Sequence, residues 1–221
     1  KLIEDAAEMI GQSYKNKPCG SFGDVSTFSF YPNKHITTGE GGMILTDNQD
    51  IAEECRSLRN LCFQKDNRFI HEKMGWNSRM SNIQAALGLA QLEKLSQSIS
   101  IKREIGNFYN SFLRKYDFLQ LPLVKTSYAL NIYWVYGIVI DEKFSDAKSL
   151  INLLSKEGIG TRPFFYPMHK QPVFKSMGFF NGDVFPIAEN LYKQGFYIPS
   201  GLGMNEQQLK RVKKTLIKIF G

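Results

Sequence analysis

Alternating apolar and polar positions predict short strands in the first part of the chain. Over residues 25–30, Phe28 and Phe30 would lie on one face of a strand and Thr27 and Ser29 on the other, which is the two-residue period of a half-buried strand. The other elements predicted here are the end of a buried strand at residues 2–3, a strand at 43–46, a short helix at 6–11 and a helix at about 50–60.

A three- and four-residue apolar period follows residue 80. Ser81 with Gln84 three residues later has the form of a capping box, so we expect a helix to begin there and to end near Leu95. Its apolar residues, among them Ile83 and Leu87, occur on almost every side of the helix. This pattern predicts a buried helix, and a second helix is predicted at about 101–115.

The chain changes character at residues 121–123, Leu-Pro-Leu. We therefore predict two domains, residues 1–119 and a smaller α+β domain at 120–221. The elements predicted in the second domain are a strand at 133–140, a helix at 145–157, an irregular aromatic and proline-rich stretch at 163–185, and helices at about 184–194 and 205–219.

Composition is that of an ordinary globular protein, with 43% apolar and 22% charged residues, 17 Phe and 10 Tyr. These values and the absence of repeats exclude disordered, collagen-like and coiled-coil classes. The longest uncharged run, residues 126–140, has 15 residues, against about 20 for a membrane span. Three cysteines match no zinc-site or disulfide pattern. No secretion signal begins the chain, so we expect a cytoplasmic protein with no metal site and no membrane partner.

The 28 Lys and Arg against 21 Asp and Glu give a formal charge of +7, which raises the question of a nucleic-acid partner. The basic residues are densest at 210–218, where Leu209, Val212, Leu216 and Ile219 supply an apolar helix face. A solvated helix face explains this cluster, and we expect no nucleic-acid partner. The charge can also attract an anionic small molecule.

Lys34 is accompanied in the sequence by a carboxylate, a hydroxyl and glycine-rich residues that suit one kind of cofactor. It follows a predicted strand that contains Ser29 and precedes the glycine-rich residues 39–42, and Asp5 ends another predicted strand. A lysine amine, a carboxylate for a ring nitrogen and hydroxyl or N–H groups for a phosphate are the requirements of pyridoxal 5′-phosphate (PLP). Spacing alone leaves a surface lysine and hairpin glycines as the alternative.

Longer motifs resemble a known family. The runs EDAAE at 4–8 and GDVSTFSFYPNKHITTGEGGM at 23–43 look like the PLP-binding signature of the DegT/DnrJ/EryC1/StrS nucleotide-sugar aminotransferases. Around Lys34 they are most similar to perosamine-synthase-like members. Further blocks that resemble the family are WNSRMSNIQAALGLAQLE at 76–93, GIGTR at 158–162, YPMHKQP at 166–172 and IPSG at 198–201.

The resemblance implies the α/β fold type I of PLP-dependent transferases, an α/β/α sandwich around a mostly parallel sheet, followed by a small C-terminal α+β domain. Residues 1–119 would be the later part of the large PLP-binding domain. In the family, a helix and further strands precede the segment that resembles residues 4–8. We therefore expect a fragment that lacks the N-terminal portion of the large domain.

The resemblance also implies residue roles around the cofactor. Lys34 would form the Schiff base with PLP and carry the proton, and Asp5 would pair with the ring nitrogen. Ser29 would bind the phosphate, which Asn77 would reach from the neighbouring subunit of a homodimer. Glu8 would lie beside the ring, where many relatives have Gln or His.

Three further residues are candidates for contacts with the substrate, namely Arg162, His169 and His35. Arginine suits a diphosphate because its guanidinium offers two parallel donors. Ser78 departs from the family, which usually has an aromatic residue there, and this leaves the packing around Asn77 open.

The implied reaction is transfer of an amino group from L-glutamate to a nucleotide-linked 4-keto-6-deoxy sugar, in the synthesis of amino sugars for surface polysaccharide. A PLP-dependent sugar dehydratase of the same fold is the nearest alternative, but it replaces the lysine by histidine, and Lys34 argues against it. An inactive fragment or a non-catalytic binding module is the other alternative.

Overall fold

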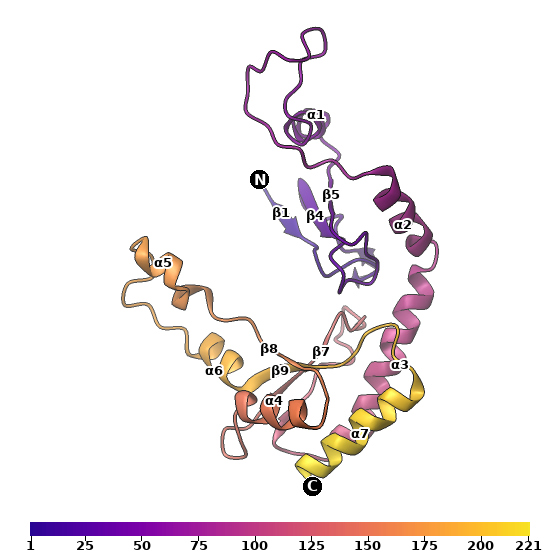
Figure 1. Ribbon diagram of the computed structural model, residues 1–221, viewed down its shortest axis with the longest axis vertical. Helices are drawn as coiled ribbons and strands as arrows, with labels where there is room; N and C mark the ends of the chain where they lie inside the picture. The colour runs from indigo at the N-terminus through magenta and orange to yellow at the C-terminus, as the bar shows by residue number, and fades with distance from the viewer. The chain divides into compact units, whose positions relative to one another are not determined.

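Helix α3 (Leu95–Leu113) begins in one part of the molecule and ends in another. The computed structural model describes residues 1–221, and their contacts form two units (Figure 1). Unit 1 contains residues 1–100 and 125–134, and unit 2 contains residues 101–124 and 135–221. The chain therefore passes between the two units more than once, because residues 125–134 belong to unit 1 again.

Unit 1 contains a three-stranded sheet of β1 (Ile3–Asp5), β4 (Val25–Ser29) and β5 (Gly42–Leu45), in the order β1-β4-β5. Strands β1 and β4 are parallel, and β4 and β5 are antiparallel (Figure 1). The register pairs Asp5 with Thr27. The carboxyl ends of β1 and β4 therefore lie at the same edge of the sheet.

The short helix predicted at residues 6–11 is wrong. Met9 N–H donates to the Ala6 carbonyl and Gln12 N–H to that of Met9, so the chain makes successive turns that end at Gly11 with φ +82°. A hairpin that the sequence analysis did not predict follows, formed by β2 (Ser13–Tyr14) and β3 (Lys17–Pro18).

The predicted capping box is confirmed, and it begins helix α2 (Asn82–Leu92). The predicted burial of this helix is wrong, since none of its residues is buried. Ile83 keeps 84% of its surface exposed, and Leu89 keeps 60%, because no other segment of these 221 residues covers the apolar side of the helix. Strand β5 is exposed for the same reason. Helix α1 (Gln49–Leu58) confirms the helix predicted at about 50–60.

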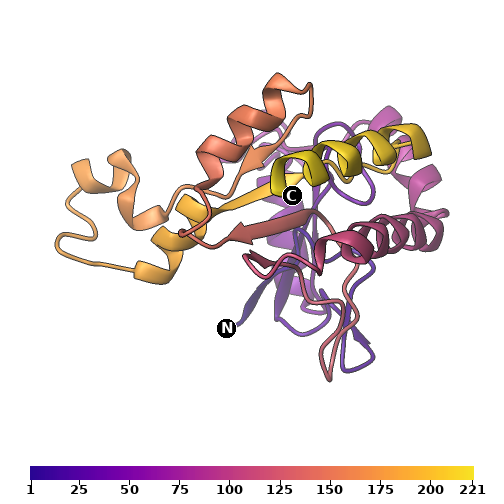
Figure 2. The same cartoon turned by 90° about the horizontal axis from the view of Figure 1, so that it is seen from below.

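Unit 2 contains a four-stranded antiparallel sheet in the order β6-β7-β9-β8. Helices α4 and α7 contact each other and lie on the same side of this sheet (Figure 2). The core includes the fully buried side chains of Tyr109, Tyr136, Ile138, Phe196 and Leu216. The elements are β6 (Leu119–Gln120), β7 (Tyr136–Ile140), α4 (Ala147–Lys156), β8 (Arg162–Pro163), the 3-10 turn η1 (Met168–Lys170), α5 (Pro172–Ser176), α6 (Pro186–Gln194), β9 (Gly195–Ile198) and α7 (Glu206–Phe220).

Strand β9 was not predicted, and it is central to this sheet. It pairs with both β7 and β8. Two side chains of α3 hold the residues that follow it, because the Tyr109 hydroxyl donates to the Pro199 carbonyl at 2.6 Å and the Lys102 Nζ donates to the Ser200 carbonyl at 2.6 Å.

Lys102 predicts a specific dependence of stability on pH. Burial lowers its pKa from the ordinary 10.5 to about 8, so the unfolded chain binds this proton more tightly than the folded chain. The free energy of unfolding should therefore rise by about 3 kcal/mol as the pH is raised from about 8 to above 10.5. Denaturant unfolding across this range should show this rise relative to Lys102→Met, and an identical pH slope in the two proteins would contradict it.

Candidate active site

Strands β1 and β4 place a carboxylate and a hydroxyl at one edge of the unit 1 sheet. Asp5 ends β1 with its side chain exposed, and its Oδ1 accepts the N–H of Ala7 at 3.0 Å. Ser29 ends β4, and its Oγ accepts the N–H of Tyr31 at 3.3 Å. Because the two strands are parallel, both groups lie at the carboxyl edge, where open α/β sheets bind ligands.

Glu4 fixes the strand that carries Asp5. Its carboxylate accepts the N–H groups of Gly20 at 2.6 Å and of Phe22 at 2.9 Å. Desolvation raises the pKa of Glu4, but these backbone donors and the Ser26 hydroxyl outweigh it and hold the pKa below its ordinary 4.5. The ionised Glu4 thus ties β1 to the loop before β4, while Asp5, the next residue, points to the opposite face of the strand.

The Lys34 amine is enclosed at the same edge. Its side chain is 8% exposed, and its Nζ lies 2.9 Å from Glu8 Oε1. The Nζ also lies 4.3 Å from the centre of the Trp134 ring, within the range of a cation–π contact. Since Glu8 is three residues beyond Asp5 in the chain, the ion pair brings the Lys34 amine to the edge that carries Asp5.

Trp134 is a site residue that the sequence analysis missed. It belongs to the segment 125–134, which returns to unit 1, whereas the sequence pattern assigned its neighbourhood to a strand of the second domain. The same segment holds His35, which is buried and whose Nε2 lies 3.0 Å from the Ile132 carbonyl oxygen. The substrate contact of His35 therefore stays a prediction, since the structure shows only a buried ring whose Nε2 faces the Ile132 carbonyl.

Asn77 lies in an exposed segment of unit 1 that bridges to Asn60. Its Oδ1 accepts the Arg79 Nε–H at 3.4 Å. The amide is thus available at the surface, and its role toward a phosphate in a neighbouring subunit stays a prediction.

Two of the predicted substrate residues lie in unit 2. Arg162 is exposed on β8. His169 is buried, and its Nε2 lies 2.9 Å from Glu189 Oε1, while Lys170 binds the other oxygen of the same carboxylate. The hydrogen bonds from Lys170 and then His169 lower the pKa of Glu189 to about 2. Glu189 thus occupies one nitrogen of the His169 ring, and substrate contacts of Arg162 and His169 stay predictions.

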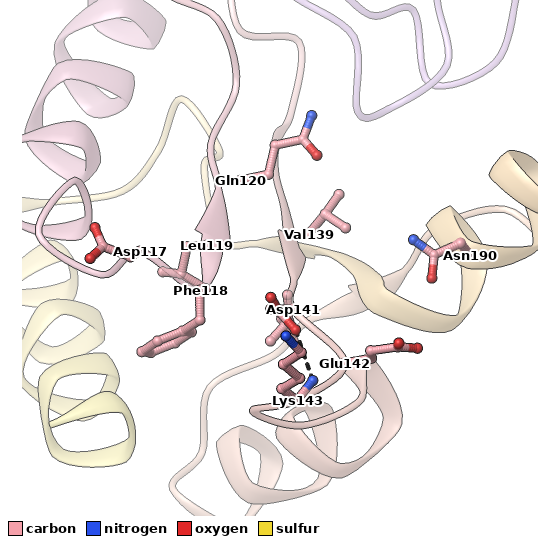
Figure 3. A pocket seen from close by; sticks show the side chains of 10 residues that line it. Asp117, Phe118, Leu119, Gln120, Val139, Asp141, Glu142, Lys143 and Asn190 are labelled. Carbon is pink, nitrogen blue, oxygen red and sulfur yellow. Dashed lines mark hydrogen bonds between the residues drawn. The ribbon is translucent and has the colours of Figure 1, made fainter.

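A cavity of about 500 Å³ also lies in unit 2, but it contains none of the predicted site residues. Figure 3 shows its charged lining, with Asp117, Asp141, Glu142 and Lys143 beside Asn190 of α6. The Asp141 carboxylate accepts the backbone N–H of Lys143 at 2.8 Å. The candidate site is therefore the sheet edge in unit 1.

The groups at this edge fit PLP. A buried primary amine suits the aldehyde of the cofactor, a carboxylate suits the ring nitrogen and a hydroxyl at a strand end suits the phosphate. The structure brings Lys34 and Glu8 into contact and places Asp5 and Ser29 at the same edge.

Comparisons with known proteins show which family the chain resembles. The model of the DegT/DnrJ/EryC1/StrS aminotransferase family matches residues 1–217. The chain is 37% identical to a GDP-perosamine synthase of Vibrio cholerae, over 99% of this chain and 59% of that protein. It is 34% identical to a protein of Bacillus subtilis named "Putative pyridoxal phosphate-dependent aminotransferase EpsN", over 99% of this chain and 56% of the relative. The chain thus spans less than two thirds of the length of these relatives.

A solved structure confirms the predicted fold class. PseC of Helicobacter pylori, an aminotransferase involved in the biosynthesis of pseudoaminic acid, superposes with a TM-score of 0.89 at 27% identity. The match covers 99% of this chain and 59% of PseC. No helix in residues 1–221 has the length and apolar character needed to span a membrane. The family match, the relatives and the fold agree, and the chain belongs to the DegT/DnrJ/EryC1/StrS aminotransferase family.

Proposed function

We propose that this chain carries the lysine-bearing part of a PLP-dependent aminotransferase that moves an amino group from L-glutamate to a nucleotide-linked 4-keto-6-deoxy sugar. The observation that carries the proposal is the Lys34 amine, which is 8% exposed and enclosed by Glu8 and Trp134. An amine on the protein surface would be hydrated, whereas an enclosed amine is oriented for covalent chemistry.

Bound PLP supplies an electron sink, through which the carbon that exchanges the amino group can lose and regain a proton. Asp5 binds the ring nitrogen and holds a proton there by its negative charge. It is suited to this task because its exposed carboxylate ends a strand that Glu4 fixes in place.

Lys34 acts twice in this proposal. Its Nζ would hold PLP through the aldehyde of the cofactor, and the free amine would take up and return the proton of the substrate carbon. A base must lie within hydrogen-bond reach of the proton it takes. Glu8 supports this role, because its Oε1 already orients the Nζ at 2.9 Å. The Trp134 ring covers the amine and excludes water.

The phosphate contacts involve a second copy of the chain. Ser29 binds the phosphate from the end of β4, and Asn77 reaches it from the neighbouring subunit of a homodimer. The exposure of Asn77 and the uncovered apolar side of α2, with Ile83 and Leu89, support a subunit contact here. A shared site of this kind would require the dimer for activity.

We infer that the acceptor is GDP-linked 4-keto-6-deoxymannose and that the product is an amino sugar for surface polysaccharide. The GDP-perosamine synthases of Vibrio cholerae and Caulobacter vibrioides, each 37% identical, support this inference. Arg162 and His169 are the residues we propose for contacts with the nucleotide or sugar, and the cytoplasm is the proposed location.

A panel of acceptors tests this inference on the full-length protein. With L-glutamate as donor, we expect kcat/KM for the GDP-linked 4-keto sugar to exceed that for the dTDP- and UDP-linked sugars by about tenfold or more, because a nucleotide pocket discriminates by its hydrogen bonds to the base. Formation of 2-oxoglutarate and the amino sugar measures the rate. Faster turnover of a dTDP- or UDP-linked sugar would contradict the choice of nucleotide, and release of a deoxygenated sugar would indicate a dehydratase.

A further inference from the structure

Helix α2 packs through its polar side. The residues of α2 that are partly buried are Gln84, Gly88 and Gln91, whose spacing of four and three places them on one face of the helix. The apolar residues Ile83 and Leu89 point elsewhere and stay exposed. A helix that turns two glutamines and a glycine toward its own chain must make specific polar contacts there.

The contacts of this face are with the backbone of residues 37–40. The Gln91 side chain binds both backbone groups of Thr37, because its Nε2 donates to the carbonyl at 2.6 Å and its Oε1 accepts the N–H at 3.1 Å. The Gln91 amide thus bonds to both the N–H and the C=O of one residue, as a paired residue of a neighbouring strand does. About two turns of the helix earlier, Gln84 Nε2 donates to the Glu40 carbonyl at 3.1 Å.

Gly88 lets the helix come close between these two glutamines. A Cβ atom at this position would lie 2.8 Å from Thr38 Cγ2, which is shorter than side-chain carbons tolerate. Thr38 is itself buried, and its hydroxyl donates to the Glu40 carbonyl at 2.7 Å. The face formed by Gln84, Gly88 and Gln91 therefore fits the segment 37–40 closely.

That segment is the second half of the loop that carries Lys34. The loop is closed at its base, because Phe30 N–H donates to the Gly41 carbonyl at 2.9 Å and Thr38 N–H donates to the Phe30 carbonyl at 3.0 Å. Its first half is held by the contact of His35 with the Ile132 carbonyl. The second half is fixed by helix α2, whose Gln91 and Gln84 bind the backbone of Thr37 and Glu40.

We propose that Gln91, assisted by Gln84, is a positioning residue for Lys34. By binding the backbone at Thr37 and Glu40, the two glutamines fix the loop that keeps the Lys34 Nζ beside Glu8 and Trp134. The inference rests on the proposed function, since it assigns to α2 the task of orienting the amine that binds PLP. Gln91 is the better probe, because Gln84 Oε1 also accepts the Ser81 N–H in the capping box at 3.0 Å.

The test uses Gln91→Leu and Gln91→Glu in the full-length protein, with Gln97→Leu, an exposed glutamine of α3, as the matched control. Three quantities are measured: the rate at which borohydride fixes PLP on the Lys34 peptide, the pH midpoint of the absorbance change of bound PLP, and the thermal unfolding midpoint. We expect both Gln91 variants to lower the trapping rate by about tenfold, because a small misplacement of a reacting group is costly. We also expect them to move the pH midpoint, with Gln97→Leu unchanged.

Outcomes separate the inference from the proposed function. Failure of the wild-type protein to take up PLP on Lys34 would overturn both. Uptake by the wild type with unchanged trapping and pH midpoint in the Gln91 variants would overturn the positioning role alone, as would an equal effect of Gln97→Leu. Should Gln91→Leu fail to fold, Gln91→Glu, which keeps the size and the acceptor for Thr37 N–H, decides by the same two measurements.

Discussion

Replacing Lys34 by alanine is expected to lower kcat for amino transfer by about 10⁴-fold, since a positioned acid–base group alone contributes up to about that factor. The variant also loses the atom to which borohydride would fix PLP. Folding should persist, because Glu8 is 38% exposed on its side chain and water can hydrate its carboxylate once the lysine is gone. Turnover of GDP-linked 4-keto-6-deoxymannose with L-glutamate measures the loss.

The matched control is Lys17→Ala, an exposed lysine in the β2–β3 hairpin of the same unit, which should keep full activity. Addition of a small primary amine such as methylamine should restore part of the activity of Lys34→Ala, since it replaces the missing base. Activity of Lys34→Ala within tenfold of the wild type, or PLP found on a different side chain, would refute the assignment.

Asp5→Asn carries the second-largest expected effect, a loss of about 10³-fold in kcat, comparable to removal of a preorganised electrostatic group from an active site. Asparagine keeps an oxygen that can accept the Ala7 N–H, which Asp5 Oδ1 accepts at 3.0 Å, so the turn after β1 should form. The negative charge is lost, however, and with it the means of holding a proton on the ring nitrogen.

Absorbance of the bound cofactor and steady-state rates measure this effect together. Asp47→Asn, an exposed carboxylate after β5, removes the same charge elsewhere in the unit and should change neither. If Asp5→Asn keeps kcat within threefold of the wild type, Asp5 does not serve the ring nitrogen.

Local patterns predicted the elements that local chemistry determines. Strand β4 follows from alternation at residues 25–29, and α2 begins where Ser81 and Gln84 form their capping box. These features depend on residues near one another in the chain. The sequence also placed Asp5 at the end of a strand, and the parallel pairing of β1 with β4 puts Asp5 and Ser29 at one sheet edge. Their roles toward a cofactor stay predictions.

Long-range packing explains what the sequence did not predict. The apolar residues of helix α2 predict burial, yet its partly buried face is formed by Gln84, Gly88 and Gln91. The two glutamines bind backbone groups that lie 44 and 54 positions away in the chain. The β-forming residues around Trp134 predicted a strand of the second domain. Only the fold shows that residues 125–134 belong to unit 1. A one-dimensional period cannot indicate which distant backbone a side chain will meet.

The return of segment 125–134 has a consequence for how the molecule is made. His35 and the Ile132 carbonyl are 97 positions apart, and closing a flexible loop of that length costs about 4 kcal/mol of chain entropy. During synthesis on the ribosome, the loop that carries Lys34 emerges before Ile132, which lies 97 positions after His35. The surroundings of the Lys34 amine are thus completed late in biosynthesis, only after residues 125–134 have been made.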